Sequence, residues 1–237
     1  MMADLFVHNG RQRRVRSRVL GGRAIRAVGA FAAAVAMVVG SATGATASGL
    51  GDAATDHVAP AQARSMGFIG CSMAENVAQG YVAVGGTRMW GPYGTGGLVV
   101  QSWTDPNSSA WQKFDQQKSR FGTPTAVWVQ ICVFAQQGAT YDEVKRLIAN
   151  ARQHTSANAT IYITGQPLYP GGNVCFLAGA NGPQLTDSLA RQAAADSTQN
   201  VSYPGAFQLQ NNEVADGCHA NTAGQQSLGR QAMAFWN

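Results

Sequence analysis

The segment "GFIGCSMAEN", residues 67–76, contains a serine whose position suits chemistry. The apolar run from Gly67 to Gly70 is typical of a short buried strand, and Ser72 follows it at the start of an expected helix. A serine at such a turn can act as a nucleophile if a base accepts its proton. The same position also suits a serine that caps a helix N-terminus. A base elsewhere in the chain would decide between the two.

His219, in the segment "DGCHANT", is the histidine best placed to be that base. Histidine is the usual general base because its pKa lies near the working pH. Asp216 stands three residues earlier, and a carboxylate at the far ring nitrogen would fix the tautomer and stabilise the imidazolium. His57 lies in a polar segment and His154 at the end of an expected helix. The types of these three residues and their positions in the sequence therefore predict that Ser72, His219 and Asp216 form a catalytic triad.

The fold must bring the segment of Ser72 and the segment of Asp216 and His219 together. From residue 65 onward, the sequence patterns of strands and helices alternate. Strands that alternate with helices form right-handed parallel βαβ units, which predicts an α/β fold with helices on both faces of a parallel sheet. Functional groups of such sheets collect at the carboxyl ends of the strands, where Ser72 would lie. The expected strands span 65–70, 87–91, 125–134, 159–165 and 200–207.

The clearest expected helix begins at Thr140, because Glu143 stands at the capping-box position. Apolar residues then recur at i, i+3, i+4 and i+7, which gives one apolar face. The last expected helix begins near Thr222, directly after the Asp216–His219 pair. The other expected helices span 73–85, 108–122 and 184–197, and 167–183 is expected to be a long loop.

Two blocks of the sequence resemble those of the SGNH (GDSL-type) hydrolases, namely "GFIGCSMAEN" and "DGCHANTAGQQSLGRQAMAFW". The resemblance covers residues 65–237 in the order of elements, and its motifs lie mainly at the two ends. It implies a flavodoxin-like three-layer sandwich with about five parallel strands in the order 2-1-3-4-5. It also implies ester hydrolysis through an acyl-enzyme, with Ser72 as nucleophile, His219 as base, Asp216 as its orienter, and no cofactor or metal.

The chain departs from this family at two blocks. Gly-Cys-Ser stands where the family usually has Gly-Asp-Ser, and residues 132–135 replace its Gly-x-Asn-Asp. The missing Asn normally donates to the oxyanion hole, and losing one such donor commonly costs about 10²–10³ in rate. Gln130 and Gln136 flank this place, and the sequence does not choose between them.

The resemblance suggests two backbone donors for the oxyanion hole. One is the N–H of Ser72. The other comes from the glycine-rich segment "GTGG", residues 94–97, where Gly97 is the first choice and Gly96 an almost equal one.

All four cysteines lie beyond the first 47 residues, and an even count in an exported protein favours two disulfides. The strand order of the family would place Cys71 beside Cys132, and it would put Cys175 and Cys218 on loops of the same face. We therefore expect the pairs Cys71–Cys132 and Cys175–Cys218. A zinc site and a reduced Cys71 that acts as the nucleophile are the alternatives.

Residues 1–47 have the pattern of a signal peptide, and 48–63 read as a flexible lead-in to a single domain at 64–237. A basic segment, the apolar stretch 27–40 and a small-x-small site occur in that order. A membrane anchor is the alternative for this segment. Residues 1–47 hold seven of the 17 basic and one of the 12 acidic residues, so ten basic and eleven acidic residues remain. The basic pI of 9.3 is therefore no sign of nucleic-acid binding.

We thus expect a secreted serine ester hydrolase that acts, as a monomer without a membrane anchor, on a small-molecule, lipid or acylated-carbohydrate ester. Two alternatives stay open. The first is a carbohydrate O-deacetylase of the same fold. The second is a secreted binding protein that has kept the fold and lost the oxyanion hole.

Overall fold

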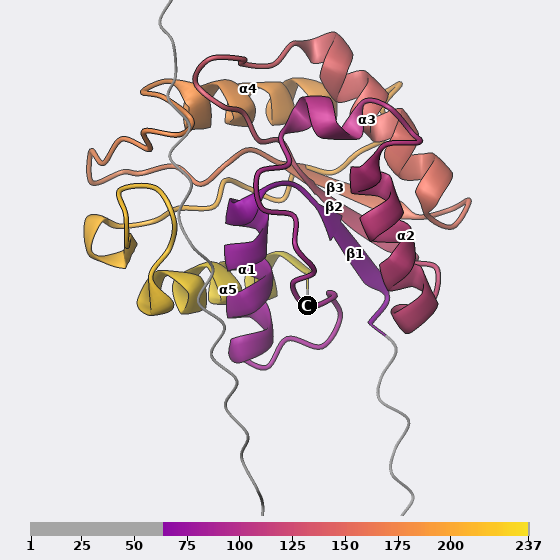
Figure 1. Cartoon of the computed structure of the whole chain (residues 1–237), viewed down its shortest axis with the longest axis horizontal. Helices are drawn as coiled ribbons and strands as arrows, with labels where there is room; N and C mark the ends of the chain where they lie inside the picture. The colour runs from indigo at the N-terminus through magenta and orange to yellow at the C-terminus, as the bar shows by residue number, and fades with distance from the viewer. Residues whose placement is uncertain (1–63, 237) are drawn as a thin grey trace, which may run out of the picture. The chain divides into compact units, whose positions relative to one another are not determined.

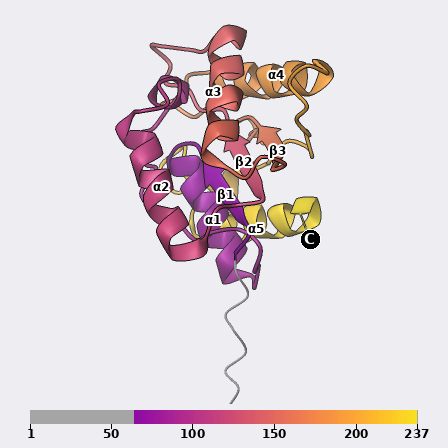
Figure 2. The same ribbon diagram turned by 90° about the vertical axis from the view of Figure 1, so that its right-hand side faces the viewer.

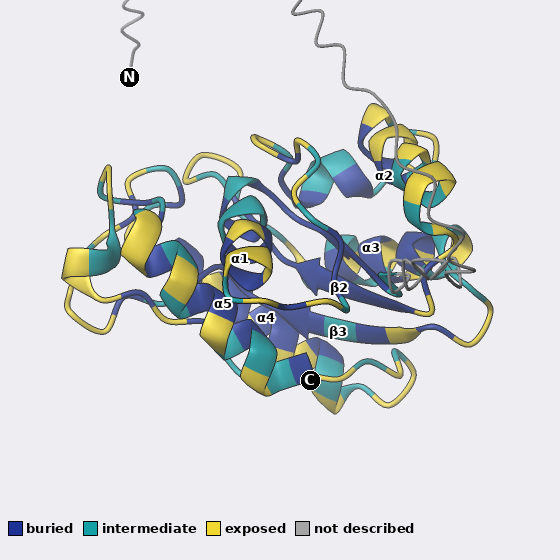
Figure 3. Cartoon of the chain, turned by 90° about the horizontal axis from the view of Figure 1, so that it is seen from below, coloured by how far each residue is buried: buried dark blue, intermediate teal, exposed yellow. Residues whose placement is uncertain are grey.

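The computed structural model describes residues 64–236, and its centre is a parallel β-sheet (Figure 1). The expected signal peptide and lead-in lie outside the described residues. The strands β1 (Met66–Ile69), β2 (Ala126–Gln130) and β3 (Thr160–Thr164) lie in the order β1-β2-β3. Every residue of β1 and β2 is buried (Figure 3), as expected of a sheet covered on both faces.

The expected outer strands are reduced to single bridges on either side of this sheet. Met89 pairs with Met66 of β1, and Ser202 pairs with Tyr162 of β3, both in parallel. The spatial order of the five segments is therefore the 2-1-3-4-5 order that the family resemblance implied. The prediction of about five full strands was too high. Pro92 and Pro204 follow the two bridges and have no N–H to extend a ladder.

The expected strand 125–134 was also too long, because its last four residues leave the sheet. Beyond Gln130, the N–H of Ile131 still donates to the carbonyl of Thr164 in β3 at 2.8 Å, and the residues after it bond to segments outside the sheet. The carbonyl of Cys132 accepts the N–H of Val100 at 2.9 Å, and the N–H of Val133 donates to the side chain of Gln166 at 3.3 Å.

Within residues 64–236, five α-helices cover the two faces of the sheet. In Figures 1 and 2, α1 and α5 lie on one face and α2, α3 and α4 on the other. The capping box predicted at Thr140 and Glu143 is present at the start of α3. None of the described helices is long and apolar enough to cross a membrane. The helices are α1 (Ser72–Ala83), α2 (Ser109–Phe121), α3 (Tyr141–His154), α4 (Gly182–Ala195) and α5 (Thr222–Trp236).

Helices α1 and α5 pack backbone against backbone, and two glycines allow it. A Cβ atom on Gly80 would lie 1.6 Å from the carbonyl oxygen of Gln225. A Cβ atom on Gly229 would lie 2.3 Å from the carbonyl of Gly80. This contact matters for the site, because Ser72 begins α1 and His219 lies three residues before α5.

Candidate active site

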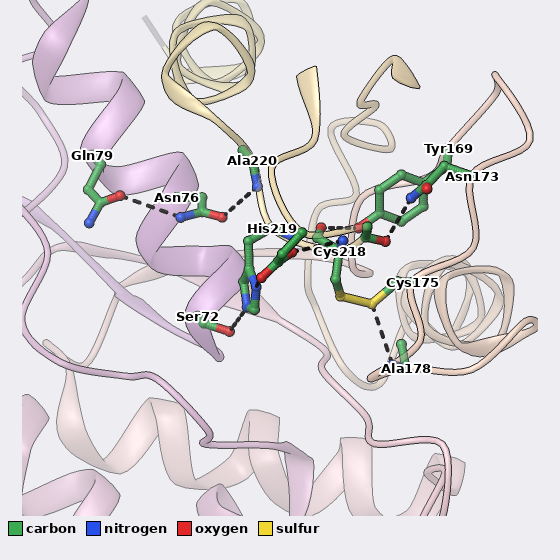
Figure 4. A network of polar contacts seen from close by, with 12 residues as sticks. Ser72, Asn76, Gln79, Tyr169, Asn173, Cys175, Ala178, Cys218, His219 and Ala220 are labelled. Atoms are coloured by element: carbon green, nitrogen blue, oxygen red, sulfur yellow. Dashed lines mark hydrogen bonds and ion pairs between the residues drawn. A yellow bond between two sulfur atoms is a disulfide. The ribbon is translucent and has the colours of Figure 1, made fainter. Parts of the chain in front are cut away.

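Ser72 is the first residue of α1 and lies just beyond the carboxyl end of β1. The chain turns tightly between them at Gly70, which has φ +153°. A Cβ atom there would lie 2.8 Å from the Cβ of Ala74 and 2.9 Å from that of Gln130, so only glycine fits. The Oγ of Ser72 lies 2.7 Å from Nε2 of His219 (Figure 4), although 147 positions separate the two residues.

The other ring nitrogen of His219 faces Asp216. Nδ1 lies 2.7 Å from Oδ2 of the carboxylate. The second carboxylate oxygen accepts the backbone N–H of His219 at 2.7 Å and that of Cys218 at 3.0 Å. Burial acts to raise the pKa of Asp216, but the hydrogen bonds from His219 and Cys218 outweigh it and lower that pKa to about 2. The carboxylate is therefore charged at neutral pH and fixed against the imidazole.

Asn76, one turn along α1 from Ser72, ties the histidine loop to the serine helix. Its Oδ1 accepts the backbone N–H of Ala220 at 3.0 Å (Figure 4). The residue that follows His219 is thus bonded to the helix that begins at Ser72. This contact of Asn76 has no local signal in the sequence, because its partner comes from the other end of the chain.

The opposite side of the histidine loop is held by the segment that follows β3. The Cys175–Cys218 disulfide fixes the residue before His219, and the Nδ2 of Asn173 donates to the carbonyl of Gly217 at 2.8 Å (Figure 4). The hydroxyl of Tyr169 donates to the carbonyl of Cys218. Burial and the charge of Asp216 raise the pKa of Tyr169, so its hydroxyl remains a donor.

The second disulfide joins the residue before Ser72 to the chain beyond β2. Cys71 pairs with Cys132, with their Cα atoms 6.1 Å apart. The two pairs are those expected from the family's strand order, and none of the cysteines is free. In this state Cys71 has no thiol with which to act as a nucleophile, and the sulfur atoms are not available to zinc.

Glu75 holds the glycine-rich segment against the first turn of α1. Its Oε1 accepts the backbone N–H groups of Tyr93 at 3.2 Å, Gly94 at 2.8 Å and Thr95 at 2.7 Å. The hydroxyl of Thr95 also donates to this oxygen and to the carbonyl of Cys71, both at 3.0 Å. This role of Glu75 leaves no local signal in the sequence, since its four donors come from a distant segment.

The expected oxyanion donor Gly97 lies two residues beyond this clamp. It is exposed and has φ +77°, a conformation that glycine adopts readily. Its role as a donor remains a prediction, as does that of Gly96. The clamp does place the segment that carries both glycines beside the residues that flank Ser72.

The two glutamines left open as replacements for the missing Asn lie in different surroundings. Gln136 is exposed in a turn. Gln130 is buried at the end of β2 beside the Cys71–Cys132 disulfide, with Oε1 3.2 Å from the Sγ of Cys132. Its Nε2 is one of three buried side-chain atoms without a partner in the described part of the chain. Of the two, only Gln130 holds an unused donor inside the fold.

No family model and no curated protein matches this chain. Among solved structures, it is similar to a candidate SGNH hydrolase from Slackia heliotrinireducens, with a TM-score of 0.51 and 18% sequence identity, over 73% of this chain and 98% of that one. The fold is that of the SGNH hydrolases. A candidate acylhydrolase from Bacteroides fragilis also matches, with a TM-score of 0.46 and 15% identity, over 72% of this chain and 85% of that one.

An SGNH fold agrees with the resemblance noted in the first and last sequence blocks. The serine block follows the first strand, and the Asp-x-x-His block precedes the last helix, as expected. At 18% identity the likeness concerns the fold alone.

Proposed function

We propose that this chain is a secreted serine ester hydrolase that acts through an acyl-enzyme. The observation that carries the proposal is the continuous chain of contacts from Ser72 Oγ to His219 Nε2 and from His219 Nδ1 to Asp216, each 2.7 Å long. A serine, an imidazole and a carboxylate in this order form the arrangement that activates a hydroxyl for attack on a carbonyl. The SGNH fold supports the same reaction class.

In the first half of the proposed reaction, Ser72 attacks the ester carbonyl. His219 accepts the hydroxyl proton at Nε2 while the Oγ–carbon bond forms, and Asp216 stabilises the resulting imidazolium. The N–H of Ser72 at the N-terminus of α1 and the N–H of Gly97 are the proposed donors to the oxyanion. The imidazolium then gives its proton to the leaving oxygen, the alcohol departs, and the acyl group stays on Ser72.

In the second half, water releases the acyl group. His219 takes a proton from the water as it attacks the acyl carbonyl, and the oxyanion forms at the same donors. The imidazolium returns the proton to Ser72 Oγ as the acyl–serine bond breaks. The products are a carboxylic acid and the free enzyme, and no cofactor takes part.

Secretion is the part of the proposal that the disulfides support. Two disulfides account for all four cysteines, which is typical of proteins that fold in an oxidising compartment. The sequence pattern of residues 1–47 points to the same location.

The proposal is tested with p-nitrophenyl esters from acetyl to decanoyl and three variants. We expect turnover by the wild type, and a loss of at least about 10³-fold in kcat/KM for Ser72→Ala and for His219→Ala. Ser188→Ala, an exposed serine on α4, is the matched control and should leave turnover unchanged. Circular dichroism melts check that each variant folds.

One result would contradict the proposed nucleophile. If Ser72→Ala keeps more than about a tenth of the wild-type kcat/KM, the side chain contributes less than about 1.4 kcal/mol to the transition state. A nucleophile cannot contribute so little.

A further inference from the structure

A cavity of about 230 Å³ lies beyond the carboxyl end of β2, between that chain segment and the start of α4. Its lining is apolar. Six of the ten lining residues are glycine or alanine, and Asn181 is the only one with a polar side chain. Small side chains leave the space open, and the lack of charge makes it suitable for an uncharged apolar group.

The first wall of this cavity is joined to the serine side of the site. Val133 lines the cavity and follows Cys132, while Ser72 follows its disulfide partner Cys71. The two cysteine Cα atoms are 6.1 Å apart. Since consecutive Cα atoms are about 3.8 Å apart, the Cα atoms of Val133 and Ser72 are separated by at most about 14 Å.

The buried side chain of Gln166 also contacts both the start of α1 and the wall of the cavity. The Nε2 of Gln166 lies 3.6 Å from the sulfur of Met73, the residue after Ser72. Its Oε1 accepts the N–H of Val133 at 3.3 Å and would lie 3.9 Å from a Cβ atom on Gly182, another lining residue. One amide group therefore separates the start of α1 from the cavity wall.

The second wall is joined to the histidine side. Ala178 lines the cavity, and its backbone N–H lies 3.5 Å from the Sγ of Cys175 (Figure 4). Cys175 is bonded to Cys218, the residue before His219, with Cα atoms 4.3 Å apart. Both walls are thus covalently linked to residues adjacent to the proposed triad.

We propose that this cavity binds the acyl chain of the substrate, and that the enzyme acts on esters of short to medium-chain fatty acids. This inference rests on the proposed function, because the chain must be attached to the carbonyl that Ser72 attacks. A volume of 230 Å³ holds about seven or eight groups the size of a water molecule, which suits about four to eight carbons. Burial of each methylene then favours the longer acyl chain by about threefold to fourfold.

The test compares the ratio of kcat/KM for hexanoyl and acetyl p-nitrophenyl esters. We expect this ratio to exceed about ten in the wild type, because four extra methylenes enter the cavity. Ala135→Trp adds an indole at the exposed edge of the lining and should lower the ratio at least tenfold. Gln137→Trp adds the same ring two residues away, at an exposed position outside the lining, and should leave the ratio unchanged.

The inference is overturned if the hexanoyl-to-acetyl ratio of kcat/KM is the same in Ala135→Trp as in the wild type and in Gln137→Trp. It is also overturned if the wild type hydrolyses acetyl esters and gains nothing from a longer chain, and in that case the proposed function would stand. The proposed function itself would fall if the wild type hydrolysed none of the esters.

Binding of a non-hydrolysed mimic tests the cavity without turnover. Hexanamide has the acyl part of the substrate, and we expect it to shift the methyl NMR signals of Ala178 and Leu185, which line the cavity. Acetamide at the same concentration should not shift them, and Ala135→Trp should remove the effect of hexanamide. If hexanamide leaves these signals unchanged in the wild type, the cavity is not the acyl site.

Discussion

At the scale of single residues, Asp216 shows how one side chain can set the geometry of a site. Its carboxylate bonds at once to the ring of His219 and to two backbone N–H groups of the same loop. The loop and the imidazole are therefore fixed by a single charged group. Removing the charge should affect both the catalysis and the stability of the loop.

For catalysis, we expect Asp216→Asn to lower kcat by about 10²–10⁴, the range seen when a triad carboxylate is lost. An amide in this place can donate to Nδ1 and so favour the wrong tautomer of His219. Steady-state kinetics with an acetyl ester measures the effect. A kcat within threefold of the wild type would show that Asp216 does not orient the base.

The same carboxylate should make stability depend on pH in a defined window. The pKa of Asp216 is about 2 in the folded state, below the ordinary value of 3.8. Its contribution is therefore fully present above about pH 4 and is lost as the pH falls through about 2. Urea unfolding gives the free energy of unfolding of the wild type and of Asp216→Asn. The difference between the two values should be constant above pH 5 and should become smaller below pH 4. A difference that does not narrow would contradict the charged contact.

Ser72, Asp216 and His219 could be predicted from the sequence because each has a local signal: a strand–turn–helix junction or an Asp-x-x-His spacing. Glu75 and Asn76 could not be predicted, although both lie within one turn of Ser72. Their partners are backbone groups at residues 93–95 and 220, and contacts between distant segments leave no local pattern.

At the scale of elements, the crossing of α1 and α5 brings together the two segments that carry the proposed triad. Gly80 and Gly229 let the two backbones touch, and no side chain fits between them. We expect Gly80→Ala to lower the free energy of unfolding by about 3 kcal/mol or more, because the added Cβ would overlap the backbone of α5. Denaturant unfolding measures this.

A matched substitution separates this effect from the intrinsic difference between glycine and alanine. Gly91→Ala has its nearest neighbour at 4.0 Å, so it should change stability by less than about 1 kcal/mol. If Gly80→Ala is as stable as Gly91→Ala, the close crossing of the helices is wrong.

The helices were more predictable than the strands. Helix α3 carries its capping box and apolar face within 14 consecutive residues, so its start was predicted correctly. The length of a strand depends on its neighbours. Residues 131–134 have a strand-like sequence and yet leave the sheet. The N–H of Ile131 still bonds to Thr164 of β3, but the backbone groups of Cys132 and Val133 bond to partners outside the sheet.

At the scale of the whole molecule, the α/β fold followed from the alternation of strands and helices. Both disulfide pairs followed from the 2-1-3-4-5 strand order that the family resemblance implies, which brings Cys71 beside Cys132. The cavity beyond β2 could not be predicted. It is lined by two segments, 133–138 and 178–185, whose small residues look unremarkable in the sequence. Only their meeting beyond the carboxyl end of β2 makes a cavity, and the disulfides link its walls to residues adjacent to the proposed triad.

The central claim is that Ser72 is an activated nucleophile, and covalent labelling tests it most directly. Purified protein is treated with a fluorophosphonate, which reacts with serines made nucleophilic by a neighbouring base. Peptide mass spectrometry should find one label per chain, on Ser72, with none on Ser188 and little on Ser72 in His219→Ala. A folded wild-type protein that stays unlabelled at Ser72 would contradict the account.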